Sequence, residues 1–113
     1  MALVSQGIGI LAGNSMSASI GIQGANQQIV AIVMPDSWDD APITFQWSLD
    51  SGFWHDVFTR DGHEQNFIWT PSAIIPIASQ YMFYTYPYLQ IRSGSRAKPI
   101  VQSADRWFAV LSQ

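Results

Sequence analysis

The strongest constraint on the fold is a period of two in hydrophobicity between residues 43 and 49. Apolar residues alternate there with polar ones: Ile43, Phe45, Trp47 and Leu49 against Thr44, Gln46 and Ser48. Successive side chains of a β-strand point to opposite faces, so the alternation indicates a strand with one face in a core. Further strand-like stretches recur along the chain, separated by clusters of turn-forming residues. The sequence therefore predicts an all-β protein.

The spacing of these stretches predicts a single jelly-roll-like antiparallel β-sandwich of about seven to nine strands. The expected strands lie at residues 16–22, 29–34, 43–49, 53–58, 65–69, 81–86, 88–92 and 106–111. Asp61-Gly62 predicts a two-residue hairpin turn that places His55 opposite Ile68 and Trp54 opposite Trp69. Residues 70–80 contain two prolines and are expected to form a corner. Residues 1–12, apolar and rich in glycine, are expected to be a flexible arm before a sandwich domain at 13–113.

Composition excludes several classes of function. Only 12% of the 113 residues are charged, about half of the ~25% usual in soluble domains. Five Lys and Arg with a net charge of -3 leave too little positive charge to grip phosphates, so no nucleic acid partner is expected. The chain has no cysteine, and no run of about 18 apolar residues predicts a membrane span. A surface poor in charge favours a component of an assembly.

No constellation of residues predicts catalysis, a cofactor or a bound metal. In the expected hairpin, His55 and His63 point to opposite faces and cannot share one ion. Asp36, Asp39 and Asp40 lie together in a loop without the spacing of a calcium-binding motif. No nucleophile-elbow or phosphate-binding glycine pattern is present. The sequence favours a protein that is not an enzyme.

Four apolar residues are candidates for an interface. Ile74, Ile75 and Ile77 lie in a proline-interrupted segment, where they must pack either in the core or against another chain. Trp38 lies among polar loop residues, where it is a platform for a sugar, an interface anchor or a lid on the sandwich. We expect these residues and the N-terminal arm to contact like subunits or a lattice.

Two stretches resemble small virion proteins of tailed bacteriophages and prophages. These proteins pair an "ITFQ-S-DSG" strand and turn with a later "YLQIRSG" segment, which correspond to residues 43–52 and 88–94. A following P-V-x-Q-x-A-D-R ending is matched from Pro99 to Arg106, with Ile100 in second place, and the similarity runs in order from 28 to 112. The resemblance implies a capsid cement (decoration) protein on the capsid surface, assembled in the host cytoplasm. It further implies a major capsid protein or another virion protein as partner, and a homo-oligomer, with a trimer favoured.

A shorter similarity supports an alternative function. Asp50-Ser51-Gly52 followed by Trp54 resembles the "S-x-D-G-x-x-W" turn of discoidin-type carbohydrate-binding sandwiches. That resemblance implies a carbohydrate-binding module associated with a virion or a tail. Strand, turn and aromatic patterns of this length also arise in unrelated β proteins.

Overall fold

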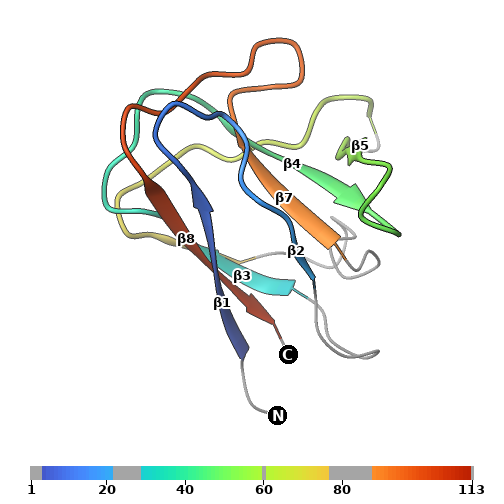
Figure 1. The fold of residues 1–113 in the computed structure, drawn as a ribbon, viewed down its shortest axis with the longest axis horizontal. Coiled ribbons are helices and arrows are strands. Elements are labelled where there is room, and N and C mark those ends of the chain that lie inside the picture. The colour runs from blue at the N-terminus through green and yellow to red at the C-terminus, as the bar shows by residue number, and fades with distance from the viewer. Residues whose placement is uncertain (1–3, 22–28, 60, 77–87, 113) are drawn as a thin grey trace.

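The protein is all-β in the computed structural model, which describes residues 4–21, 29–59, 61–76 and 88–112. Two four-stranded antiparallel sheets contain all the strands of the described residues, and none of those residues is helical. Figure 1 shows β1 beside β8 in one sheet and β4 beside β7 in the other. The strands are β1 (Val4–Ile10), β2 (Ile20–Gly21), β3 (Ile29–Val33), β4 (Ile43–Ser48), β5 (His55–Asp56), β6 (Ile74–Pro76), β7 (Tyr88–Ser93) and β8 (Arg106–Ser112).

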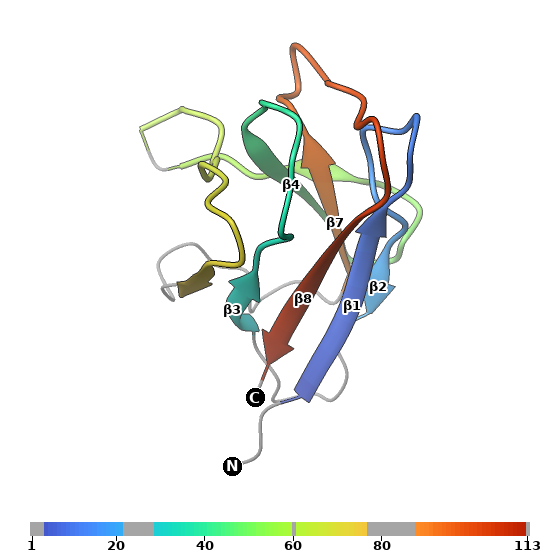
Figure 2. The ribbon, with the colours of Figure 1, turned by 90° about the vertical axis from the view of Figure 1, so that its left-hand side faces the viewer.

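The strand order is symmetrical along the chain. One sheet, named here the β8 sheet, has the order β1-β8-β3-β6, and the other, the β7 sheet, has the order β2-β7-β4-β5. The first strand therefore pairs with the last, the second with the seventh, the third with the sixth and the fourth with the fifth. Figure 2 shows the β8 sheet in front, with β4 and β7 behind it.

The core lies between the two sheets and is filled by the inward residues of the longer strands. β4 contributes Ile43, Phe45 and Trp47, as the alternation predicts, and β7 contributes Leu89 and Ile91. The β8 sheet faces them with Ile8, Ile10, Ile32, Phe108 and Val110. Because the chain has no cysteine, the close packing of branched and aromatic side chains, and not disulfide bonds, stabilises the fold.

The N-terminal segment is a strand rather than a flexible arm. β1 pairs with β8 through all seven of its residues, from Val4 opposite Ser112 to Ile10 opposite Arg106. Ile8 and Ile10 are buried in the core, while Gly7 and Gly9 alternate with them. The expected boundary at residue 12 is therefore wrong for Val4–Ile10, because burial of the two isoleucines ties this end to the sandwich.

The hairpin at Asp61-Gly62 exists, but its register differs from the prediction by one residue. Phe58 lies opposite Glu64, and the Thr59 N–H donates to the His63 carbonyl at 2.7 Å. Gly62 has a φ of 87°, the left-handed conformation that a three-residue hairpin loop requires. A slip of one residue reverses the face of each side chain.

The ladder of this hairpin is also shorter than predicted. Phe67 leaves it and exchanges two backbone hydrogen bonds with Ile43, and His55 pairs with Trp47 of β4. Trp69 instead donates its indole N–H to the Pro35 carbonyl at 2.9 Å. The predicted pairings of His55 with Ile68 and of Trp54 with Trp69 are therefore wrong.

Two other segments differ from the prediction. The expected corner at 70–80 contains β6, because Ile75 pairs with Ile32 and packs against the core. In the expected strand at 16–22, Met16 makes an isolated bridge to Arg92 and β2 covers only Ile20–Gly21 among the described residues. The expected strand at 81–86 lies outside the described residues.

Candidate functional site

Trp38 is buried, although the sequence places it in a polar loop. Its side chain is 9% exposed and meets the Phe108 ring edge to face, with ring centroids 5.5 Å apart. The indole N–H donates to the Ala41 carbonyl at 3.0 Å. Trp38 thus closes one end of the sandwich and is not available as an interface anchor, which corrects that expectation.

The isoleucines of the predicted interface separate into different environments. Ile74 is 62% exposed, whereas Ile75 points the other way and packs against the core. Adjacent residues of a strand point to opposite faces, so β6 presents one isoleucine to each side of its sheet. Ile77 lies outside the described residues.

Ile74 belongs to a larger apolar surface on the outside of the β8 sheet. One row across the sheet runs from Gly7 to Ala109, Val33 and Ile74. The outward residues of the four strands, named here the apolar face, are Ser5, Gly7, Gly9, Ala31, Val33, Ile74, Pro76, Trp107, Ala109 and Leu111. None of these residues is charged. Antiparallel sheets that border water usually alternate apolar inward with polar outward residues, and this sheet is apolar on both sides.

Trp107 is the largest side chain of the apolar face. It is 59% exposed, and its ring lies over Gly9 of β1. A Cβ atom at Gly9 would come within 2.7 Å of the ring, so glycine is what allows the indole to lie across the neighbouring strand. Sequence analysis did not single out this tryptophan. The signal was available, because Trp107, Ala109 and Leu111 alternate with the buried Phe108 and Val110.

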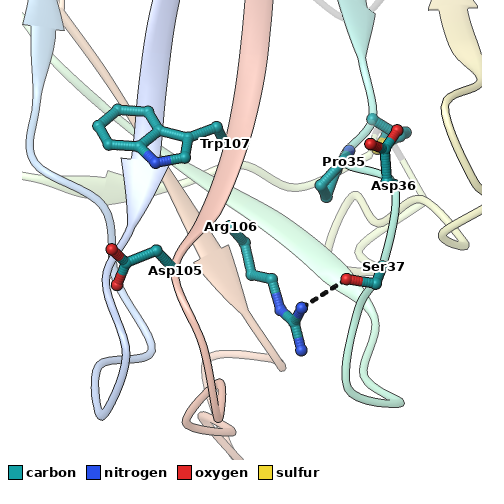
Figure 3. A pocket seen from close by; sticks show the side chains of 7 residues that line it. Pro35, Asp36, Ser37, Asp105, Arg106 and Trp107 are labelled. Atoms are coloured by element: carbon teal, nitrogen blue, oxygen red, sulfur yellow. Dashed lines mark hydrogen bonds between the residues drawn. The ribbon is translucent and has the colours of Figure 1, made fainter.

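A pocket of about 300 Å³ borders the apolar face where β3 and β8 separate. Figure 3 shows Trp107 and Asp105 on one side of Arg106, with Pro35, Asp36 and Ser37 on the other. The lining residues are Met34, Pro35, Asp36, Ser37, Asp105, Arg106 and Trp107. The pocket combines an exposed aromatic ring with carboxylate, hydroxyl and guanidinium groups. That combination of groups can bind a polar ligand with an apolar face.

Arg106 is held rigidly beside the pocket. Its guanidinium donates to Gln102 Oε1 at 3.0 Å, to Ser37 Oγ at 2.7 Å and to Asp39 Oδ1 at 3.1 Å. Hydrogen bonds from the Ser103 hydroxyl and backbone N–H, with a smaller contribution from Arg106, lower the pKa of Asp39 below its ordinary value of 3.8. The arginine therefore serves the structure of the loops that border the pocket.

Three residues of the stretches that resemble virion proteins, Gln102, Arg92 and Gly94, are buried and make structural contacts. Gln102 is fully buried and joins Asp39, Ser93 and Arg106 through its side-chain amide. Arg92 forms ion pairs with Asp56, at 2.9 Å, and with Glu64. Gly94 has a φ of 94°, and a Cβ there would lie 2.4 Å from the Lys98 carbonyl oxygen. These three positions hold the loops together.

The histidines and aspartates that the sequence singled out do not converge. His55 and His63 are both exposed, the first in β5 and the second after the Asp61-Gly62 turn. Asp36 accepts a hydrogen bond from the Ser72 hydroxyl, Asp39 binds Ser103, and Asp40 is exposed. Within residues 4–21, 29–59, 61–76 and 88–112, no group of three or more His, Cys, Asp or Glu could hold a metal ion.

Comparisons with known proteins leave the family open. No family model matches the chain, and no curated protein matches it either. In the part of the chain that the structure describes, no helix is long and apolar enough to cross a bilayer.

Proposed function

We propose that the protein is a non-enzymatic virion structural protein of the capsid cement type, and that the apolar face is its docking surface. The observation that carries the proposal is the combination of Ile74 and Trp107, both more than half exposed, on a sheet face without charge. Covering a large apolar side chain contributes about 1.5–3 kcal/mol. An exposed face of this kind is typical of a surface that another protein covers.

The partner and the place follow from the resemblance to phage virion proteins. The partner is a major capsid protein or another virion protein, the site is the capsid surface, and the protein joins the particle in the host cytoplasm. Gln102 and Arg92, which belong to the resembling stretches, make buried polar contacts within the chain. A cement protein needs such a rigid body, because its task is to clamp neighbours rather than to transform a substrate.

The fold itself supports a jelly roll. Pairing of first with last, second with seventh, third with sixth and fourth with fifth strands is the order obtained when a long antiparallel hairpin folds over into two sheets. Capsid and lectin domains both use this architecture. The fold is therefore compatible with the proposed function without selecting it.

A substitution in the apolar face tests the docking surface. Ile74→Asp places a charge in its central row, and we expect the variant to stay folded while its binding to purified particles of the cognate phage falls strongly. Leu49→Asp is the matched control, because Leu49 is similarly exposed and directly follows β4 of the other sheet. If Ile74→Asp binds particles as the wild type does, the apolar face is not the docking surface.

The pocket beside Trp107 favours carbohydrate binding as a second candidate function. Sugars place C–H groups on the faces of aromatic rings and hydroxyls against carboxylates, and Trp107 and Asp105 lie together at this pocket. Titration with host surface glycans, followed by tryptophan fluorescence, tests the idea. Saturable binding that Trp107→Ala abolishes supports a glycan-binding module, and the absence of any response removes it.

A further inference from the structure

The two sheets have four edges, and one of them differs from the rest. β2 and β5 have two residues each, and β6 has three and includes Pro76. β1 has seven residues, contains neither proline nor charge, and keeps a regular register with β8 throughout. Proteins normally protect their edges by short strands, proline, charge or bulges, because an open edge is a template for another strand. β1 has none of these protections.

On its side away from β8, β1 pairs with no strand among the described residues. Apart from the ladder to β8, the structure gives the backbone of Val4–Ile10 no hydrogen bond to any described residue. Ser5 and Gly7 are exposed. A Cβ at Gly7 would meet no atom within 4 Å, so the outer face above the middle of the strand is open as well.

We propose that the free edge of β1 pairs antiparallel with β1 of a second copy of this chain, about a twofold axis at Gly7. The axis places Gln6 opposite the partner's Ile8 and Ser5 opposite the partner's Gly9. The two β8 sheets join into one sheet of eight strands, with a continuous apolar face. The pairing gives a dimer in place of the trimer that the resemblance to cement proteins implies.

A second copy fits this edge because the edge is neutral in a chain with a net charge of -3. A charged partner finds no complementary group on β1, whereas two copies meet along it without repulsion. Twofold pairing uses the same surface on both chains, so each backbone group that one strand offers is matched by the other. The Trp107 ring, which lies over Gly9, borders the partner's Ser5, a residue small enough to accommodate it.

Disulfide trapping tests the pairing directly, because the chain has no cysteine of its own. In Gly7→Cys, the twofold axis brings the two introduced thiols opposite each other. Directly opposed residues of antiparallel strands have Cβ atoms about 4.5–5.5 Å apart, which lets a disulfide form with small adjustments. We expect mild oxidation to link most of the protein into covalent dimers. Ala97→Cys, in an exposed turn of the loop after β7, is the control and should remain monomeric in denaturing gels.

Sedimentation of purified protein tests the same edge without assuming its register. The wild type should sediment as a dimer, and Gly7→Glu should raise the dimer dissociation constant by about ten-fold or more with an unchanged far-ultraviolet circular dichroism spectrum. Ala97→Glu should remain dimeric. A wild type that is monomeric at high concentration, or a Gly7→Glu variant that dimerises normally, overturns the proposal. Neither measurement involves phage particles. A negative result would therefore overturn the proposed dimer without bearing on the proposed virion function.

Discussion

The outer faces of the two sheets differ in polarity. The β7 sheet carries polar side chains outward, and its own chain covers them: Arg92 donates to Thr44 and pairs with Asp56 and Glu64. The outer face of the β8 sheet has no charge and leaves Ile74 and Trp107 exposed. Contacts within the chain therefore satisfy the charge of Arg92 on the first face. The second leaves these two apolar side chains open to solvent.

The largest expected effect concerns the polar face. Arg92→Leu leaves the carboxylates of Asp56 and Glu64 without their buried partner, and we expect it to reduce the free energy of unfolding by about 3 kcal/mol. Arg96 also pairs with Asp56, but its side chain is largely exposed. Arg96→Leu should therefore cost less than about 1 kcal/mol. Urea denaturation of both variants measures the difference, and equal losses would mean that burial of Arg92 is unimportant.

Substitutions at the two isoleucines of β6 test the core and the apolar face separately. Ile75→Asp buries a charge without a partner against the core, and we expect a loss of about 2 kcal/mol or more. Ile74→Asp should change stability by no more than about 0.5 kcal/mol, because the side chain is exposed. Thermal unfolding of the pair measures this. A strongly destabilised Ile74→Asp would show that the apolar face is already covered within the chain.

The glycines of β1 give a finer test of the apolar face. Gly9→Ala pushes against the Trp107 ring and should cost about 1 kcal/mol, with a change in near-ultraviolet circular dichroism as the indole moves. Gly7→Ala meets open space and should leave both signals close to those of the wild type. Identical spectra for the two variants would contradict the placement of Trp107 over β1.

The smallest expected effect is a pH dependence at the edge of the pocket. The pKa of Asp39 is lowered from 3.8, mainly by the hydrogen bonds of Ser103. A carboxyl with a lowered pKa in the folded state stabilises the fold above its ordinary pKa, and this contribution disappears as the pH falls from 3.8 through the folded value. Asp39→Asn should therefore show a shallower loss of stability below about pH 4 than the wild type. Equal slopes for Asp39→Asn and the wild type below this pH would contradict the prediction.

Local patterns in the sequence predicted two kinds of strand. In one, apolar and polar residues alternate, and in the other the residues on both faces are apolar. The alternation at 43–49 became β4, and the β-branched run at 29–34 became β3. The segment Val4–Ile10 was misjudged because two of its three outward positions, Gly7 and Gly9, are glycines, which weakens the polar half of the pattern. The alternation of Ile8 and Ile10 with Gly7 and Gly9 was nevertheless a period-two signal.

Contacts between distant residues could not be predicted from local patterns. Trp38 lies among polar neighbours but packs on Phe108, which is 70 positions later, and Arg92 meets Glu64 across 28 positions. For the candidate site, the sequence identified Ile74 but neither its separation from Ile75 nor the exposure of Trp107. Those outcomes depend on which sheet each strand joins. That placement is determined by the packing of all the core side chains together.

A reconstruction of the phage particle with the protein bound, at a resolution that distinguishes the two sheets, tests the central claim most directly. The account predicts that the β8 sheet faces a neighbouring virion protein, with Ile74 and Trp107 covered, while the polar outer face of the β7 sheet makes no contact. A particle in which the β7 sheet forms the contact and the apolar face remains open to solvent would contradict it.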